Sequence, residues 1–311
     1  MKDIFIKLGI ISLIILIGCG KNPAVVNLRI INAQKITEKG GISPIWSPDS
    51  KKIAFISPAG NIWITSLESG EMQQITDEVV GAGYEYISWS PDGKKFAFNN
   101  ENDMGIMNID GTDRVIVVGH SAASQPQWLP KAKRIVFMLA STYAMINIDG
   151  TECKYIGGTL GLAYLGYCSG FPPKWAFSLL SNGTQMLINT TELSRGKDQK
   201  VKFFPAGIGI VEVKCESADN LNVRMLQKLK GVVSGASCSP DGKFIAFSHL
   251  GYIWIMNADG TGLTQLTSSE LGNVKAGPVF SPDGKKLAIV LSKIGDSYDN
   301  IWILTLGREK D

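Results

Sequence analysis

The residues that could carry out chemistry are few in this chain of 311 residues. It contains 2 histidines, His120 and His249, which are too few for a His-rich metal cluster. His120 is followed by Ser121, but neighbours in sequence form a catalytic dyad only when their geometry in space matches. We therefore expect no catalytic residue, no metal and no cofactor, and predict that the chain is not an enzyme.

Carboxylates leave one enzymatic alternative open. Glycosidases use two acidic side chains that flank the bond to be broken. The carboxylates available for such a mechanism are Glu85, Glu101, Asp103 and Asp296. Two of them facing each other at roughly 5–10 Å would favour a glycan-binding or glycan-cleaving enzyme. A flat apolar or aromatic patch would instead favour a surface for a protein partner.

Four aspartates recur in one setting, the sequence Ser-Pro-Asp-Gly-Lys (Ser-Pro-Asp-Ser-Lys in the first copy) followed by an alternating apolar segment. Pro fixes φ at the first corner of a turn, Asp tolerates the second, and Gly adopts the positive φ that closes it. The copies begin at Ser47, Ser90, Ser239 and Ser281, with weaker ones at Leu129 and Leu180. Asx hydrogen bonds account for these aspartates, and no calcium-loop spacing surrounds them. We interpret them as turn formers rather than cation ligands.

These turns divide the chain into repeats of four short strands. Four antiparallel strands with turn signals between them make one propeller blade. The first strands end at Trp46, Trp89, Trp128, Trp175, Cys238 and Phe280, which lie 39 to 47 residues apart except for one interval of 63. Because a common propeller repeat needs about 40–45 residues, the longest interval is one blade with an insertion. The sequence therefore predicts an all-β, six-bladed β-propeller.

The two ends of the chain predict how the ring closes. The last repeat has three strands and no fourth before Asp311. The segment from Ala33 to Thr37 matches Gln74-Ile75-Thr76, which ends a fourth strand elsewhere. We therefore expect residues 30–38 to complete the last blade and remove the open edges of the sheet.

The N-terminal segment predicts export and a lipid anchor. The apolar run from Leu8 to Ile17 follows a basic start and is too short to span a bilayer comfortably. Leu16-Ile17-Gly18-Cys19 resembles the lipobox of bacterial lipoproteins, which implies cleavage before Cys19 and diacylglyceryl attachment to its sulfur. An ordinary signal peptide or an uncleaved anchor is the alternative. The expected domains are a lipoprotein signal peptide (1–18), a lipid-anchored linker (19–29) and the propeller (30–311).

The repeat resembles the WD-repeat-like propellers of the TolB family. The shared features are Trp-Ser-Pro-Asp-Gly-Lys turns, Ile-Trp third strands and Asp-Gly-Thr turns, over residues 30–306. TolB is a periplasmic component of the Tol–Pal envelope system, in which its propeller binds the peptidoglycan-associated lipoprotein. This chain departs from the pattern because it has no α/β domain before the propeller and carries the lipobox. Related propellers precede the hydrolase domain of prolyl-oligopeptidase-like peptidases, but no Gly-x-Ser-x-Gly nucleophile turn is present.

The resemblance implies a lipid-anchored, TolB-like scaffold that binds a protein or peptide at the bacterial cell envelope. The alternative is an envelope-associated enzyme that acts on glycans. Gly20, directly after the cysteine, implies the periplasmic side of the outer membrane if the organism is diderm. A formal net charge of +3 is nearly balanced and does not indicate a nucleic-acid partner. We expect a monomer that contacts the membrane through the lipid on Cys19.

Blade topology sorts the loops onto two faces. The turns between first and second strands, and between third and fourth strands, form one face, which we call the turn face. The loops from second to third strands, and from blade to blade, form the opposite or irregular face, where we expect binding. The candidate binding residues there are Glu85, His120, Tyr164, Tyr167 and Phe171. For the aromatic residues, a loop folded onto its own blade is the alternative.

Four cysteines follow Cys19, and an even number in an exported chain permits disulfides. They are Cys153, Cys168, Cys215 and Cys238. Cys168 and Cys215 both lie in the fourth repeat and are the candidate pair. Cys238 stands where other repeats have an inner-strand aromatic residue, so we expect it to pack as a small hydrophobic side chain.

Overall fold

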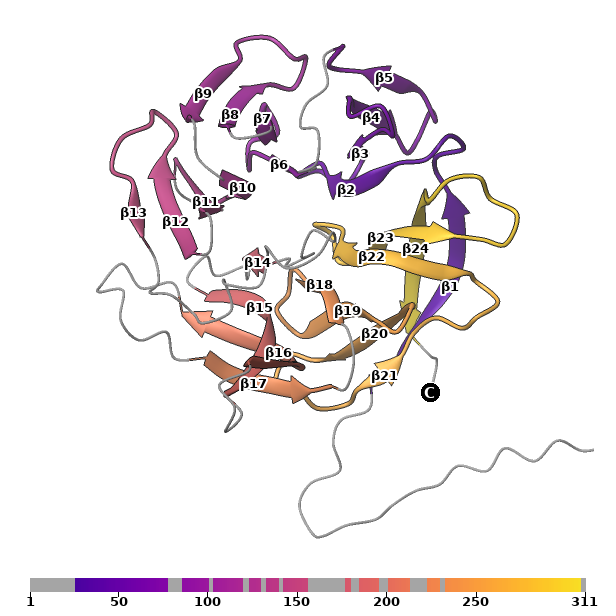
Figure 1. Cartoon of the computed structure of the whole chain (residues 1–311). Helices are drawn as coiled ribbons and strands as arrows, with labels where there is room; N and C mark the ends of the chain where they lie inside the picture. The colour runs from indigo at the N-terminus through magenta and orange to yellow at the C-terminus, as the bar shows by residue number, and fades with distance from the viewer. Residues whose placement is uncertain are drawn as a thin grey trace, which may run out of the picture.

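A computed structural model describes most of the chain after residue 25. The described residues are 26–77, 86–100, 103–119, 123–129, 133–139, 142–155, 177–179, 185–195, 201–212, 223–229 and 233–308. Within these ranges, six four-stranded antiparallel sheets surround a common centre, as Figure 1 shows. The expected all-β propeller fold is confirmed.

The first three sheets follow the chain in order from the innermost strand outward. The first contains β2 (Ile42–Trp46), β3 (Lys52–Ile56), β4 (Ile62–Ser66) and β5 (Met72–Gln74). The second contains β6 (Ile87–Trp89), β7 (Lys95–Asn100), β8 (Asp103–Asn108) and β9 (Val115–Val118). The third contains β10 (Ala123–Trp128), β11 (Arg134–Leu139), β12 (Thr142–Asn147) and β13 (Lys154–Tyr155).

The fourth and fifth sheets repeat the same order. The fourth contains β14 (Phe177–Leu179), β15 (Gln185–Arg195), β16 (Val201–Glu212) and β17 (Val223–Lys228). Its β15 and β16 pair from Gln185↔Glu212 to Arg195↔Val201, so the inserted residues of the longest repeat extend one hairpin. The fifth contains β18 (Val233–Cys238), β19 (Phe244–His249), β20 (Tyr252–Asn257) and β21 (Thr264–Gln265).

The sixth sheet joins the two ends of the chain. It contains β22 (Asn273–Phe280), β23 (Lys286–Ser292), β24 (Asn300–Arg308) and, as its outermost strand, β1 (Leu28–Lys35). β1 runs antiparallel to β24, with Leu28 opposite Arg308 and Lys35 opposite Trp302. The N-terminal strand therefore occupies the place of the missing fourth strand, as the matching sequence at residues 33–37 predicts.

A threonine just after the outermost strand confirms this equivalence. The Thr37 hydroxyl accepts a hydrogen bond from the backbone N–H of Ile301 at 2.9 Å. Thr76 accepts the corresponding bond from Ile62 in the first sheet at 3.0 Å, and Thr267 accepts it from Ile253 in the fifth at 2.9 Å. In all three sheets, a threonine just after the outermost strand thus accepts a hydrogen bond from a backbone N–H near the start of the neighbouring strand.

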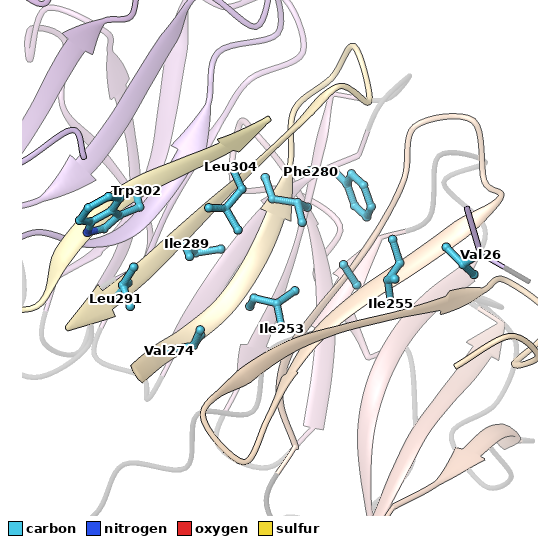
Figure 2. Close-up of a cluster of buried hydrophobic side chains, with 11 residues drawn as sticks. Val26, Ile253, Ile255, Val274, Phe280, Ile289, Leu291, Trp302 and Leu304 are labelled. Atoms are coloured by element: carbon cyan, nitrogen blue, oxygen red, sulfur yellow. The ribbon is translucent and has the colours of Figure 1, made fainter. Parts of the chain in front are cut away.

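The core lies between neighbouring sheets. Figure 2 shows one cluster in which Ile253 and Ile255 of the fifth sheet pack with Ile289, Leu291 and other residues of the sixth. Alternation within the strands directs these apolar side chains toward the adjacent sheets. A hydrogen bond also crosses from sheet to sheet, because the Trp46 indole donates to the carbonyl of Val279 at 2.9 Å. Trp46 also packs against Ala288 and Ile303 of the sixth sheet, so this inner-strand aromatic residue lies between two blades.

The innermost strands of the fifth and sixth sheets approach each other at two glycines. A Cβ built on Gly277 would lie 2.2 Å from Cα of Gly235, and a Cβ on Gly235 would lie 2.5 Å from Cα of Gly277. The atoms in the way are backbone atoms, which cannot rotate aside as a flexible side chain can. Glycine at these positions therefore permits the close contact between the two blades.

Candidate functional site

The aspartates of the turn face are fully engaged in their own turns. In the first copy, the Ser47 hydroxyl donates to Asp49 Oδ1 at 2.5 Å, and the backbone N–H of Lys51 donates to the same oxygen at 3.0 Å. The serine-to-aspartate distances in the other copies are 2.6 Å for Ser90–Asp92, 2.7 Å for Ser239–Asp241 and 2.6 Å for Ser281–Asp283. The interpretation of these residues as turn formers is confirmed.

The same hydrogen bonds set the charge of these carboxyl groups. The bond from the serine hydroxyl is the largest cause that lowers the pKa of Asp49, Asp92 and Asp241 below the ordinary value. An acid catalyst needs a pKa near the working pH, so these ionised groups are poorly suited to donate protons. Among the described residues, no group of three or more His, Cys, Asp or Glu side chains could hold a metal ion.

The second turn type of this face is equally self-contained. Its threonine hydroxyl donates to the aspartate Oδ1 at 2.6 Å, in Asp110–Thr112, Asp149–Thr151 and Asp259–Thr261. An asparagine side chain two residues before the aspartate donates to the threonine hydroxyl at 2.9, 2.8 and 3.0 Å, from Asn108, Asn147 and Asn257. These polar groups satisfy one another and shape the turn.

The binding residues that the sequence predicts lie outside the described residues. This holds for Glu85, His120, Tyr164, Tyr167 and Phe171, for the lipidation site Cys19, and for Glu101, Cys168 and Cys215. Their roles therefore stay predictions. The structure locates the remaining candidates, which are two carboxylates, one histidine and two cysteines.

Asp296 ties the loop between β23 and β24 to the N-terminal strand. Its carboxylate accepts from the backbone N–H of Lys293 at 3.2 Å and from Lys35 Nζ at 3.4 Å. The first of these bonds is the main cause that lowers the pKa of Asp296. Asp103, the other described carboxylate, begins β8 in the second sheet. The two acids belong to different sheets, and Asp296 has a pKa shifted away from that of a general acid.

His249 is buried and does not form part of an open site. It ends β19 with 7% of its surface exposed, and its ring centre lies 6.1 Å from that of Trp254 in an edge-on arrangement. Its position at the irregular-face end of the strand therefore does not make it available to a ligand.

Both described cysteines are free thiols. Cys153 is exposed and Cys238 is half-buried. Cys238 packs against the cluster that contains Ile245, Phe247 and Met256, and burial raises its pKa to about 11. The expectation that Cys238 acts as a small hydrophobic side chain is confirmed.

The irregular face presents exposed apolar side chains that sequence reasoning missed. The side chain of Ile294 is fully exposed, that of Leu250 is 65% exposed and that of Tyr298 is 50% exposed. All three lie in loops from a second to a third strand, Leu250 in the fifth sheet and the other two in the sixth. The available signal was an apolar residue directly before a glycine in such a loop, as in Leu250-Gly251 and Ile294-Gly295.

These loops pack against the connections beside them. A Cβ on Gly251 would lie 2.5 Å from the Asn273 side chain, and a Cβ on Gly272 would lie 2.8 Å from the carbonyl of Ser292. A Cβ on Gly40 would lie 2.7 Å from the Pro58 side chain and 3.2 Å from Tyr298 Cβ. We call the segments 37–41, 57–60, 249–252, 268–273 and 292–300 the loop cluster. It joins the fifth, sixth and first sheets on the irregular face.

One buried asparagine holds part of the loop cluster in place. Asn300 is 1% exposed, and its Oδ1 accepts from the Gly40 backbone N–H at 3.1 Å and from the Thr37 hydroxyl at 3.2 Å. Its Nδ2 donates to the Tyr298 carbonyl at 3.0 Å. The backbone that carries Tyr298 is therefore fixed before any partner arrives, which reduces the ordering cost of binding.

The described residues contain no helix long and apolar enough to cross a membrane.

Among the described residues, the other exposed large apolar side chains lie on the outer strands, at Ile31 of β1, Met72 of β5 and Val115 and Ile116 of β9. They are distributed over three sheets around the rim, whereas those of the loop cluster lie in the loops of two neighbouring sheets.

Comparison with known proteins supports the fold and leaves the function open. No family model matches the chain. A segment of 61 residues is 41% identical to an uncharacterized peptidase, YuxL, of Bacillus subtilis (strain 168), over 18% of this chain and 9% of that protein. The chain therefore spans a small part of the curated relative that it matches.

Two solved structures are similar over larger parts of the chain. TolB of Acinetobacter baumannii aligns with a TM-score of 0.53 and 19% identity, over 74% of this chain and 55% of that one. A gluconolactonase of Xanthomonas campestris aligns with a TM-score of 0.62 and 12% identity, over 93% and 98% of the two chains. At these identities the likeness shows the fold alone. The resemblance to TolB is thus confirmed as a shared β-propeller fold.

Proposed function

We propose that this chain is a lipid-anchored, six-bladed propeller that binds a protein or peptide at the bacterial cell envelope through its loop cluster. The observation that carries the proposal is the set of exposed apolar side chains at Leu250, Ile294 and Tyr298 on a preformed backbone. Apolar groups gathered on one surface and edged by polar residues are typical of a protein-binding site. The six sheets and the pairing of β1 with β24 support the closed ring.

Three observations on the sequence support the location. The lipobox-like tetrad ending at Cys19 would place a diacylglyceryl group at the N-terminus of the mature chain. Two acyl chains are sufficient for stable membrane anchoring, because each buried methylene contributes about 0.8 kcal/mol. The resemblance to the TolB family, whose members act in the periplasm, is consistent with this site. With Gly20 after the cysteine, we propose the periplasmic side of the outer membrane if the organism is diderm.

The test is crosslinking in cells followed by mass spectrometry, with Ile294→Asp as the variant. Ile294 is fully exposed, so the substitution should leave the fold intact while it adds a charge to the proposed interface. The matched control is Val115→Asp, which changes an exposed apolar residue of β9 outside the loop cluster. We expect the same partner with the wild type and the control, and its loss with Ile294→Asp. Identical crosslinks from all three proteins would refute binding at the loop cluster.

A second candidate is an enzyme that acts on an envelope glycan. The similarity to a gluconolactonase over 98% of that chain favours it, because the same fold there supports catalysis. Against it stands Asp296, whose lowered pKa suits an ion pair better than proton donation. The test is release of new reducing ends from purified envelope glycans by the wild type and by Asp103→Asn. Activity that depends on Asp103 would replace the scaffold proposal.

A further inference from the structure

The direction of β1 determines from which face the N-terminal segment leaves the propeller. β24 begins at Asn300, directly after a loop of the irregular face, and ends at Arg308. Near that end, the backbone N–H of Leu306 donates at 2.8 Å to the carbonyl of Lys285, which belongs to a turn of the turn face. Since Leu28 pairs with Arg308 in antiparallel register, β1 begins at the turn face.

The chain is fixed in position even before β1. Val26 is 5% exposed and belongs to the apolar cluster between the fifth and sixth sheets, where Figure 2 shows it near Ile255. Only seven peptide steps then separate Val26 from Cys19. Fully extended, they reach at most about 25 Å. An eight-residue strand such as β1 is itself about 27 Å long, so a tether that starts at the turn face cannot pass the ring and reach beyond the irregular face.

We propose that the lipid on Cys19 holds the propeller with its turn face against the membrane, so that this face meets phospholipid head groups and the loop cluster points away. This inference rests on the lipid anchor of the proposed function. It adds which surface is in contact with lipid and which is free for a macromolecular partner.

The chemistry of the turn face suits a head-group layer. In each of the four strongest turns an exposed lysine follows directly after the turn: Lys51, Lys94, Lys243 and Lys285. The neighbouring aspartates already accept hydrogen bonds from their own serine hydroxyls and from the backbone N–H groups of these lysines. The aspartates stay ionised, and Lys243 Nζ lies 3.6 Å from Asp241 Oδ2, so the turn face carries charges of both signs. Its exposed lysine ammonium groups are the ones that lipid phosphates attract near a membrane.

The test measures the distance from each face to the bilayer by fluorescence quenching. Lys285→Cys and Ser297→Cys place a fluorophore on opposite faces of the same sheet, and both native side chains are exposed. Cys153, Cys168 and Cys215 are replaced by Ser, and the half-buried Cys238 is retained. The full lipidated chain is reconstituted into phosphatidylethanolamine–phosphatidylglycerol vesicles that carry a nitroxide on the head group. Matching unfolding midpoints show that both labelled proteins are folded.

We expect quenching at position 285 to be at least about three-fold stronger than at position 297, because the strand length separates the two faces by more than 20 Å. Equal quenching at both positions, or stronger quenching at 297, would overturn the orientation. The anchor is tested separately by fractionation of cells that express Cys19→Ala. If that variant stays on the membrane, the lipid anchor of the proposed function fails and the orientation fails with it. If only the quenching pattern fails, the anchor and the scaffold proposal stand.

Discussion

The serine that opens each turn engages several partners with one hydroxyl. Ser281 is completely buried; its hydroxyl donates to Asp283 at 2.6 Å and accepts from the backbone N–H of Lys286 at 2.9 Å. Loss of such a group leaves a backbone donor and a carboxylate without their usual partner. The recurrence of this serine therefore reflects the construction of the turn.

We predict that Ser281→Ala lowers the free energy of unfolding by about 1–3 kcal/mol, the cost of leaving a partly buried polar group unsatisfied. Urea denaturation measures the change. Ser69→Ala is the control, since Ser69 is exposed and its hydrogen bonds are longer, at 3.3 and 3.4 Å. A Ser281→Ala protein as stable as the control would contradict the role given to the hydroxyl.

The turn aspartates also predict a dependence of stability on pH. The bond from Ser47 lowers the folded-state pKa of Asp49 below its ordinary value of 3.8. The contribution to stability is therefore present above pH 3.8 and is lost as the pH falls through the lower folded value. Asp49→Asn should be less stable than the wild type at pH 7, and the difference should shrink in acid. Unfolding midpoints of the wild type and of Asp49→Asn, at pH 7 and at acidic pH, measure this. A difference in stability that does not change with pH would argue against it.

At the scale of elements, β1 has a larger role than its exposed position indicates. It pairs with the edge of β24 from Leu28↔Arg308 to Lys35↔Trp302, and Leu28, together with Val26 just before the strand, lies at the cluster between two sheets. Without β1, β24 would present unpaired backbone groups at an open edge, which is a site for aggregation.

A chain that begins at residue 40 is therefore expected to unfold or aggregate, whereas a chain that begins at residue 21 should fold. Circular dichroism and size-exclusion chromatography compare the two. Equal stability of both chains would show that the ring does not need its N-terminal strand.

A milder change, Thr37→Val, removes the hydroxyl that accepts the hydrogen bond from the Ile301 backbone N–H. This variant should fold with reduced stability.

The sequence predicts the repeated elements well because their signals are local. The serine, proline and aspartate of a turn act within a few residues, and Thr37 is recognised by its match to Thr76. Leu250, at φ +50°, is different, because its loop is held by the next blade, where the Val274 backbone N–H donates to the Gly251 carbonyl at 2.9 Å. The burial of Val26 before the first strand is likewise a tertiary effect. The loop cluster could not be predicted because it assembles from separate blades.

At the scale of the whole molecule, the contact between blades limits which residues the inner strands can contain. Gly235 and Gly277 face each other across β18 and β22 with backbone atoms in the space of any Cβ. Neither residue has an apolar side chain to contribute, and their role is to let two sheets come together.

Gly277→Ala should destabilise the protein by about 1–3 kcal/mol, since overpacking forces the backbone to shift. The control is Gly119→Ala, where the nearest atom to the new Cβ is 3.6 Å away and the change should stay within about 0.5 kcal/mol. Thermal unfolding of the two variants measures the difference. Equal midpoints would show that the inner strands can separate at no cost.

Closure by β1 also determines the order in which the fold can be completed. Thr37 and Asn300, which share a hydrogen bond, are 263 residues apart. β1, which is synthesised first, can therefore pair only after β24 has been synthesised. The entropy of closing so long a loop slows this pairing step. During synthesis β1 emerges while β24 is still to be made. Until β24 is complete, β1 lacks its partner, and the unfinished chain is exposed to aggregation during that interval.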